Sequence, residues 1–226
     1  MDERPLGRRA YGSIPHLPGS ELGGDRYLPP TQVRWLVERA PKGSVLTVEE
    51  KLDGSCVAVA NEGGRILALG REGKLAATSG NEARRLFADW VDPHRFDWLG
   101  DGERVVGEWL ALAHGTRYEL SHEPFVAFDV LRSSERLRRA DWVDRARAAE
   151  LTLPFTVHRA AIGVEEALAL LGDGGHGAID PPEGVVYRLE RSTAPTLVAK
   201  VVRPGKVAGA LLPENSGRPA IWNWRP

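Results

Sequence analysis

The sequence predicts an α+β fold made of antiparallel β-sheets flanked by helices. Apolar, β-branched runs of strand length recur along the chain and are separated by short turns rich in glycine and asparagine. Helical patterns are fewer, and they do not alternate with strands in the rhythm of a parallel sheet. The expected elements are a helix at 31–40, strands at 45–51, 55–61 and 65–71, a helix at 81–91, strands at 103–111 and 125–131, helices at 134–151 and 163–171, and strands at 184–190 and 196–203.

Local signals support the elements of the first half. Residues 1–30 are rich in Gly and Pro, which indicates an extended lead-in. Thr31 can cap the first helix, and Pro41-Lys42-Gly43 ends it. Asn61-Glu62-Gly63-Gly64 is a hairpin turn between the second and third strands. The helix at 81–91 is amphipathic. Its apolar side is formed by Ala83, Leu86, Phe87 and Trp90.

Local signals also indicate the loops and the arginine-rich helix of the second half. The segment 113–123 is expected to be a loop or a short strand pair, and 172–177 is a glycine-rich connector. The helix at 134–151 carries many arginines on its polar side. We predict a single domain, in which residues 1–44 form an N-terminal lead-in and helix packed on a core formed by residues 45–226.

Composition narrows the class of protein. The chain has 226 residues, 42% of them hydrophobic and 27% charged, which is typical of a soluble globular domain. Its net charge of −1 argues against global attraction to nucleic acid or membrane, so an anion site must be a local patch. The single cysteine, Cys56, excludes an internal disulfide. The start has no apolar signal region and no later run has membrane-span length, so we predict a cytoplasmic protein without a membrane partner.

The chain is organised around Glu50-Lys51-Leu52-Asp53-Gly54-Ser55. Two strands are expected to meet here at a tight bend, with Gly54 in a backbone conformation closed to other residues. Lys51 and Asp53 would then share a pleat face and point into a cleft. The alternative is an ordinary surface hairpin, because this tetrapeptide pattern is common in turns.

Five further segments follow this motif in a fixed order. They are Gly70-Arg71-Glu72-Gly73, Gly107-Glu108-Trp109-Leu110, Phe125–Val130, Pro182-Glu183-Gly184-Val185-Val186 and Leu197–Arg203. Together the six resemble the motifs of the covalent nucleotidyltransferases, which are the ATP-dependent DNA and RNA ligases and the mRNA capping enzymes. The resemblance implies the adenylyltransferase (ATP-grasp-like) domain of ligases over residues 45–226. It also implies ATP as the AMP donor and Mg²⁺ or Mn²⁺ as the metal.

The resemblance assigns a role to individual residues. Lys51 is the nucleophile that forms lysyl-AMP, and Glu183 is the metal ligand. The implied catalytic set is Lys51, Asp53, Glu183 and Lys200. The implied nucleotide-binding set is Glu50, Lys51, Arg71, Glu108, Phe128 and Lys200, with Glu108 on the ribose hydroxyls and Phe128 stacked on the adenine.

The charge of a lysine limits what Lys51 and Lys200 can do in a buried site. An ordinary lysine has a pKa of about 10.4 and is protonated at neutral pH. A nucleophilic Lys51 must therefore be desolvated or lie near cations such as Arg71 and Lys200. Lys200 stands in an otherwise apolar strand, where an unpartnered lysine is costly, and this favours a functional role.

The remaining candidates keep an alternative interpretation. Glu108 could be a salt-bridged residue at a strand edge, and Glu183 an ordinary turn carboxylate, although a carboxylate suits magnesium. Phe128 could belong to the core, which is where we place Phe125. His114 could approach a phosphate or lie in a surface loop.

The length after the fifth motif suggests which member of the superfamily this is. The residues after Arg203 are too few for the OB-fold barrel that DNA ligases and capping enzymes carry there, so we expect no C-terminal OB-fold. Residues 14–20 and 113–118 also resemble small bacterial and phage-like RNA ligases. One departure is Val202, where the family has a second lysine; Arg203 or Lys206 could replace it.

The sequence therefore predicts an ATP-dependent RNA ligase that joins 3′-hydroxyl and 5′-phosphate RNA ends in RNA repair, with an end-healing kinase or phosphatase as a possible partner. The alternatives are a DNA nick-sealing ligase without its own OB-fold, and a nucleotide- or RNA-binding module without turnover. Trp222 and Trp224 could stack on bases or tuck onto the domain. A cluster of arginines could contact RNA or form a solvated helix face. It comprises Arg132, Arg136, Arg138, Arg139, Arg145 and Arg147.

Overall fold

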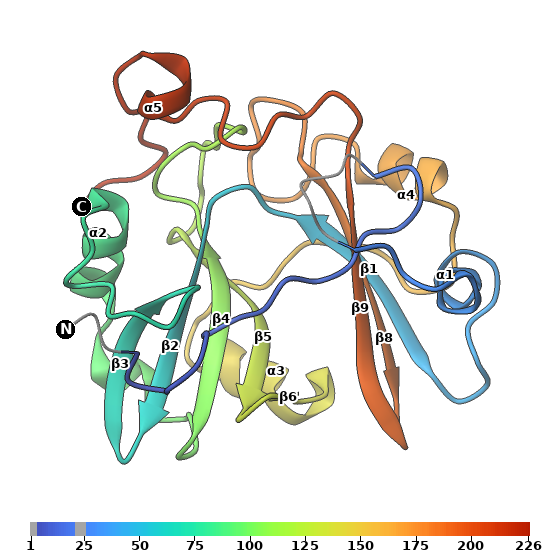
Figure 1. Cartoon of the computed structure of the whole chain (residues 1–226), viewed down its shortest axis with the longest axis horizontal. Helices are drawn as coiled ribbons and strands as arrows, with labels where there is room; N and C mark the ends of the chain where they lie inside the picture. The colour runs from blue at the N-terminus through green and yellow to red at the C-terminus, as the bar shows by residue number, and fades with distance from the viewer. Residues whose placement is uncertain (1–3, 21–25) are drawn as a thin grey trace.

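The computed structural model describes residues 4–20 and 26–226, and within them the strands form two antiparallel sheets (Figure 1). One sheet has the order β7-β1-β8-β9 and the other β3-β2-β4-β5-β6. The first contains β1 (Val45–Lys51), β7 (Thr156–His158), β8 (Gly184–Arg191) and β9 (Ala194–Val202). The second contains β2 (Ser55–Glu62), β3 (Arg65–Gly70), β4 (Glu103–Trp109), β5 (Phe125–Arg132) and β6 (Glu135–Arg136). The predicted α+β fold with antiparallel sheets is confirmed.

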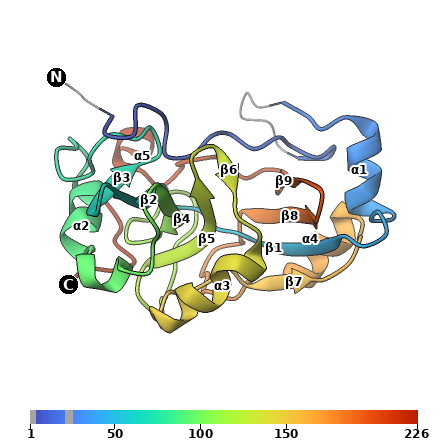
Figure 2. The same ribbon diagram turned by 90° about the horizontal axis from the view of Figure 1, so that it is seen from below.

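Helices cover the outer parts of this arrangement. They are α1 (Pro30–Val37), α2 (Glu82–Trp90), the 3₁₀ turn η1 (Pro93–Phe96), α3 (Arg139–Ala148), α4 (Val164–Leu171) and α5 (Pro213–Ser216). In Figures 1 and 2, α1 and α4 lie beside the four-stranded sheet, whereas α2 and α3 lie beside the five-stranded sheet. No helix in the described part of the chain is both long and apolar enough to span a membrane.

The predicted bend between β1 and β2 is a crossing from one sheet to the other. β1 pairs with β7 and β8, whereas β2 pairs with β3 and β4. The two strands do meet at a tight bend, because only three residues separate the end of β1 from the start of β2, but they belong to different sheets and do not pair with each other. In Figure 1 the connection from β1 to β2 runs from one sheet to the other. Residues at the end of β1 and the start of β2 line a pocket.

The N-terminal lead-in also connects the sheets. The backbone amides of Ala10 and Tyr11 donate to the Arg71 carbonyl after β3. Further along, the Leu17 amide donates to the Lys200 carbonyl of β9. Figure 2 shows this segment running along one side of both sheets. Residues 1–3 and 21–25 of the predicted lead-in lie outside the described residues.

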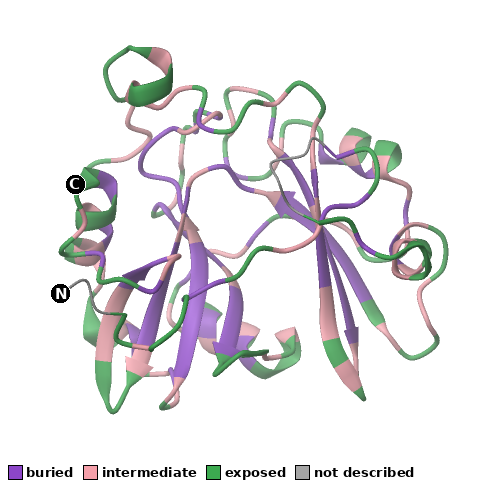
Figure 3. Cartoon of the chain, viewed as in Figure 1, coloured by how far each residue is buried: buried purple, intermediate pink, exposed green. Residues whose placement is uncertain are grey.

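Apolar side chains form a separate core on each sheet. Phe87, Trp109, Phe125 and Trp142 belong to the largest cluster, which joins α2 and α3 to the five-stranded sheet. A second cluster packs Leu36 of α1 and α4 residues against the four-stranded sheet. Figure 3 shows the buried residues concentrated in the strands. Both polar and apolar side chains line the pocket between the sheets.

One predicted helix is too long. Residues 134–151 were expected to be helical throughout, but α3 begins at Arg139. Ser133 has a φ of 53° and forms a turn, after which Glu135 and Arg136 pair with the end of β5 as β6. The charged residues of this stretch also suit a short edge strand, and pattern alone does not separate the two.

Candidate active site

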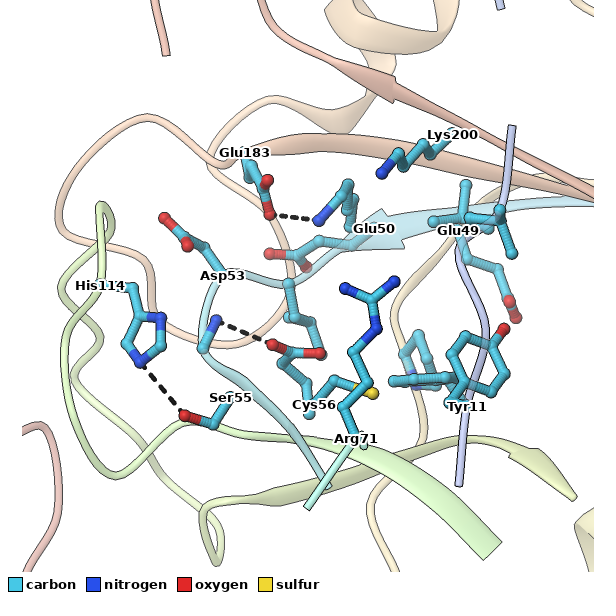
Figure 4. Close-up of a pocket in the computed structure, with 18 of the residues that line it drawn as sticks. Tyr11, Glu49, Glu50, Asp53, Ser55, Cys56, Arg71, His114, Glu183 and Lys200 are labelled. Carbon is cyan, nitrogen blue, oxygen red and sulfur yellow. Dashed lines mark hydrogen bonds and ion pairs between the residues drawn. The ribbon is translucent and has the colours of Figure 1, made fainter. Parts of the chain in front are cut away.

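A pocket of about 420 Å³ lies between the two sheets. Every residue of the predicted site lines it: Glu50, Lys51, Asp53, Arg71, Glu108, Phe128, Glu183 and Lys200. They come from β1, β4, β5, β9 and the connections that flank the strands. Figure 4 shows Arg71 and Lys200 reaching into the pocket from opposite sides. Segments far apart in sequence thus bring their side chains to one space.

Lys51 is held where β1 ends. It pairs with Gly184 of β8, which places it beside Glu183, the residue before that strand. Lys51 Nζ donates to Glu183 Oε2 at 2.5 Å. Both side chains are largely buried. The interpretation of this motif as an ordinary surface hairpin is wrong.

Burial by itself lowers the pKa of Lys51, but neighbouring carboxylates outweigh it. Glu183 contributes most of the opposing effect, and Glu108 and Asp53 add to it, so the pKa of Lys51 is raised. We expected cations to favour a neutral lysine. The carboxylates dominate instead, and the raised pKa favours the ammonium form of Lys51.

Gly54 is required for a reason other than the expected one. Its φ is not positive, so no conformation closed to other residues is involved. A Cβ atom at Gly54 would instead lie 2.5 Å from the Trp109 carbonyl oxygen of β4. The Gly54 amide also donates to Glu108 Oε1 at 3.0 Å. Close approach of the crossing segment to β4 therefore explains the glycine.

Glu108 faces the pocket from β4. Its partner is the Gly54 amide, so the salt-bridged strand edge considered above is not found. Burial raises the pKa of Glu108 to about 8, against the opposing effect of Lys51. The turn interpretation of Glu183 is also wrong, since that carboxylate is buried beside Lys51 and burial raises its pKa.

The segment 113–118 surrounds Asp53. Thr116 Oγ1 donates to Asp53 Oδ2 at 3.2 Å, and the Asp53 amide donates to the Tyr118 hydroxyl at 3.1 Å. Gly115 packs so closely that an added Cβ would lie 2.7 Å from Asp53 Oδ2. Burial raises the pKa of Asp53, and the positive charges of Lys51 and Lys206 only partly offset this increase. His114 lines the pocket in the same segment and is not an exposed loop residue.

Lys206 and Arg203 make different contacts near Asp53 and Glu183. Lys206 Nζ donates to the Gly115 and Pro181 carbonyls, each at 2.8 Å, and its charge acts on Asp53. Arg203 Nε donates to the Pro182 carbonyl at 3.3 Å. Of the two candidates for the second cation of the fifth motif, Lys206 is the one whose charge acts on Asp53.

Two aromatic side chains form part of the wall of the pocket. Phe128 lines it and meets the Tyr11 ring edge-on, with 5.3 Å between centroids. Phe125 is buried in the main core, as predicted. Glu50 accepts from the Gly175 amide at 2.7 Å, and burial raises its pKa to about 7.

A buried ionic network behind the pocket was not predicted. Arg188 Nη1 of β8 lies 3.0 Å from Asp129 Oδ1 of β5, and Arg188 Nε lies 3.9 Å from Glu49 Oε2 of β1. Asp129 also accepts from Tyr11 and Arg136. The sequence does carry a sign of a buried charge, because Arg188 interrupts an apolar strand as Lys200 does. No sequence pattern indicated its partners.

Contacts within the chain bear on two of the surface interpretations. All six arginines considered for RNA binding pair with carboxylates, and Arg136 and Arg139 are directed inward. Trp222 and Trp224 pack against the main core. The intramolecular pairs favour the interpretation of the cluster as a solvated helix face, and the tail tucks onto the domain.

The two antiparallel sheets and the pocket between them are those of a ligase nucleotidyltransferase domain. Comparison with known proteins supports this class. The structure resembles a putative ATP-dependent DNA ligase from Aquifex aeolicus, with a TM-score of 0.52 and 20% identity over 85% of this chain and 49% of that one. It also resembles an alanine mutant of Naegleria gruberi RNA ligase with ATP and Mn, with a TM-score of 0.53 and 17% identity over 93% of this chain and 64% of that one. The chain spans about half the length of the Aquifex aeolicus protein and of several of the Naegleria gruberi structures.

The RNA ligase family model matches residues 44–202. The chain belongs to the RNA ligase family. No curated protein sequence matches it significantly.

Proposed function

We propose that this chain is an ATP-dependent RNA ligase that works through lysyl-AMP on Lys51. The observation that carries the proposal is the placement of Lys51 Nζ in the pocket between the sheets, 2.5 Å from the Glu183 carboxylate. Arg71 and Lys200 line the same pocket and supply positive charge for a triphosphate. Family membership supports the same reaction class.

The carboxylates of the pocket fit a divalent metal held together with nucleotide. The described residues contain no group of three or more His, Cys, Asp or Glu side chains arranged to hold a metal by themselves. Mg²⁺ is commonly bound by one or two carboxylates together with phosphate oxygens and water, and Mn²⁺ accepts similar ligands. Glu183 would be the protein ligand. The bound ion would neutralise charge on the reacting phosphates.

Glu183 couples metal binding to the charge state of Lys51. The carboxylate that would hold the metal is also the one that most raises the pKa of Lys51. Glu183 can serve a metal only by giving up part of its interaction with the lysine. That loss weakens the largest effect opposing burial, so the pKa of Lys51 shifts downward, toward the neutral amine that attack requires.

The reaction then follows three steps. Lys51 Nζ attacks the α-phosphorus of ATP, a P–N bond forms, and the P–O bond to pyrophosphate breaks. An oxygen of an RNA 5′-phosphate next takes the AMP, and the RNA 3′-hydroxyl finally displaces AMP to form the phosphodiester. Catalysis of this kind depends mainly on positioning and charge neutralisation. The proposed roles are adenine stacking for Phe128, ribose binding for Glu108, nucleotide contact for Glu50, phosphate contact for Arg71, Lys200 and Lys206, and orientation of Lys51 for Asp53.

The test is incubation with α-labelled ATP and magnesium, followed by denaturing electrophoresis. Label should remain on the wild-type protein, be released by acid as expected of a phosphoamide, and be absent from Lys51→Ala. Lys42→Ala, which changes an exposed lysine, is the matched control. Labelling of Lys51→Ala at the wild-type level would refute the nucleophile assignment. Absence of label on the wild type would instead favour a binding module without turnover.

Substrate choice needs a second measurement. An RNA ligase should read the 2′-hydroxyls near the 3′-hydroxyl end, because these groups distinguish RNA from DNA. Terminal nucleotides of the 3′-hydroxyl strand are varied between ribose and deoxyribose, with the 5′-phosphate strand held constant. Equal rates would favour a DNA-sealing enzyme. A kinase or phosphatase that produces 3′-hydroxyl and 5′-phosphate ends is the class of partner this activity requires, and RNA repair in the cytoplasm is the setting we propose.

A further inference from the structure

We infer that Ser55, Arg84 and His114 form a subsite for the 5′-phosphate of the RNA, at the end of the pocket away from Phe128. This inference rests on the proposed ligase function, and it assigns residues to the second step of the reaction. Arg84 and Ser55 lie outside the predicted site, and all three residues line the pocket.

Ser55 and His114 are the fixed part of this subsite. Ser55 begins β2, and its Oγ lies 3.3 Å from His114 Nε2 (Figure 4). The His114 carbonyl accepts from the Leu211 amide at 2.6 Å, and the next residue, Gly115, packs on Asp53. Both groups are therefore held beside Asp53 before any ligand binds.

Arg84 supplies the charge. It lies in the first turn of α2, and its side chain passes Gly70, where an added Cβ would be 3.8 Å from Arg84 Cδ. Among the residues that the structure describes, its guanidinium has no carboxylate or hydrogen-bond partner. The neighbouring Arg85 differs, because its guanidinium donates to the Ser79 carbonyl at 2.7 Å. An exposed guanidinium that lines a pocket and has no partner among the described residues is available to an incoming anion.

The chemistry of the three groups matches a terminal phosphate. A hydroxyl, an imidazole and a guanidinium can each donate to phosphate oxygens, and arginine can do so with two parallel hydrogen bonds. Arg84 is exposed, so the end of a polymer can reach it. The base-stacking end near Phe128 lies elsewhere in the pocket and remains free for the adenine.

The subsite serves the second step, in which AMP passes from Lys51 to the RNA 5′-phosphate. An oxygen of the 5′-phosphate forms a bond to the phosphorus of lysyl-AMP, which creates a P–O–P anhydride. The P–N bond to Lys51 breaks, its electron pair goes to Nζ, and the nitrogen takes up a proton. Ser55, Arg84 and His114 bind and orient the phosphate and do not themselves form or break a bond.

The test separates the first step from the second. Lysyl-AMP is formed with α-labelled ATP, isolated, and chased with RNA that bears either a 5′-phosphate or a 5′-hydroxyl. Arg84→Ala and His114→Ala should form lysyl-AMP within about twofold of wild type but transfer AMP to 5′-phosphate RNA at least about tenfold more slowly, since each loses a charge-assisted or positioned donor. Arg85→Ala is the matched control and should resemble wild type in both steps.

A binding measurement decides the subsite even without turnover. Fluorescence anisotropy compares labelled 5′-phosphate and 5′-hydroxyl oligoribonucleotides of one sequence. The wild type should prefer the 5′-phosphate, and Arg84→Ala should lose the preference. A parallel loss of the first step would overturn the inference and place the phosphates of ATP in this subsite. An unchanged preference and second step would also overturn it. A wild type that forms no lysyl-AMP would refute the proposed function, while the anisotropy result would still decide the subsite.

Discussion

Asn223→Ala should weaken both the fold and the candidate site, although Asn223 lies in the C-terminal tail and outside the family match. Its Oδ1 accepts from the Tyr118 amide at 3.0 Å, and its Nδ2 donates to the Leu110 carbonyl at 2.7 Å. The Tyr118 hydroxyl in turn accepts from the Asp53 amide. The tail is thereby linked, through one tyrosine, to the segment that follows Lys51.

The structure sets the expected magnitude. Leu110 and Tyr118 are buried, so alanine at 223 leaves a backbone carbonyl and a backbone amide without their partners. Each orphaned buried group costs about 1–3 kcal/mol, and access of water near the partly exposed tail reduces the sum. We expect a loss of about 2–3 kcal/mol in unfolding free energy, which for a chain of this size lowers Tm by roughly 4–12 °C.

Two measurements check this reasoning. Thermal unfolding reports stability, and the rate of lysyl-AMP formation at a temperature where the variant is folded reports the site. Arg225→Ala is the matched control, because Arg225 is in the same tail and its pair with Glu82 is exposed. An Asn223→Ala variant with wild-type Tm and wild-type adenylylation would refute the link between tail and site.

Three further predictions concern the pocket. Glu183→Gln should keep the fold but slow metal-dependent lysyl-AMP formation on the order of 100-fold, measured by labelling across magnesium concentrations, because the metal loses its charged ligand. A wild-type magnesium response would contradict this. Glu108→Gln should flatten the pH dependence of stability: burial raises the pKa of Glu108 from 4.5 to about 8, so the folded wild type holds a proton that the unfolded chain releases. Its unfolding free energy should therefore fall as pH rises across that window, and equal denaturant-unfolding profiles would refute the assignment. Gly54→Ala should lose about 1–3 kcal/mol in denaturant unfolding, because its Cβ would lie 2.5 Å from the Trp109 oxygen, and unchanged stability would show that the crossing segment can shift.

The strands were predictable because their signal is local. The prediction for residues 45–51 coincides with β1, and those for 55–61 and 184–190 end one residue short of β2 and β8. Pairing is not local, since alternation of apolar residues identifies a strand without naming its partner. The crossing at Gly54 was therefore missed, and the glycine was explained by φ when Trp109 of another strand was the cause.

The site was predictable where ordered motifs supplied it and unpredictable where tertiary contacts did. The motif residues line one pocket, and their chemical roles remain predictions. The charge state of Lys51 could not be foreseen, because it depends on how closely Glu183 and Glu108 approach. The choice between Arg203 and Lys206 likewise depends on the path of the chain after β9.

The buried network of Arg188, Asp129 and Glu49 connects the two sheets behind the pocket. Arg188 belongs to the four-stranded sheet and reaches Asp129 of the five-stranded sheet at 3.0 Å. Buried ion pairs often contribute little net stability compared with apolar packing, but loss of one member costs about 3–5 kcal/mol. We therefore infer that the network serves mainly to specify the relative placement of the sheets. Arg188 Nη2 also donates to the Phe128 carbonyl at 3.0 Å. One side chain thus contacts both the buried carboxylate of the opposite sheet and the backbone that carries the proposed adenine platform, so we expect replacement of Arg188 to disturb both.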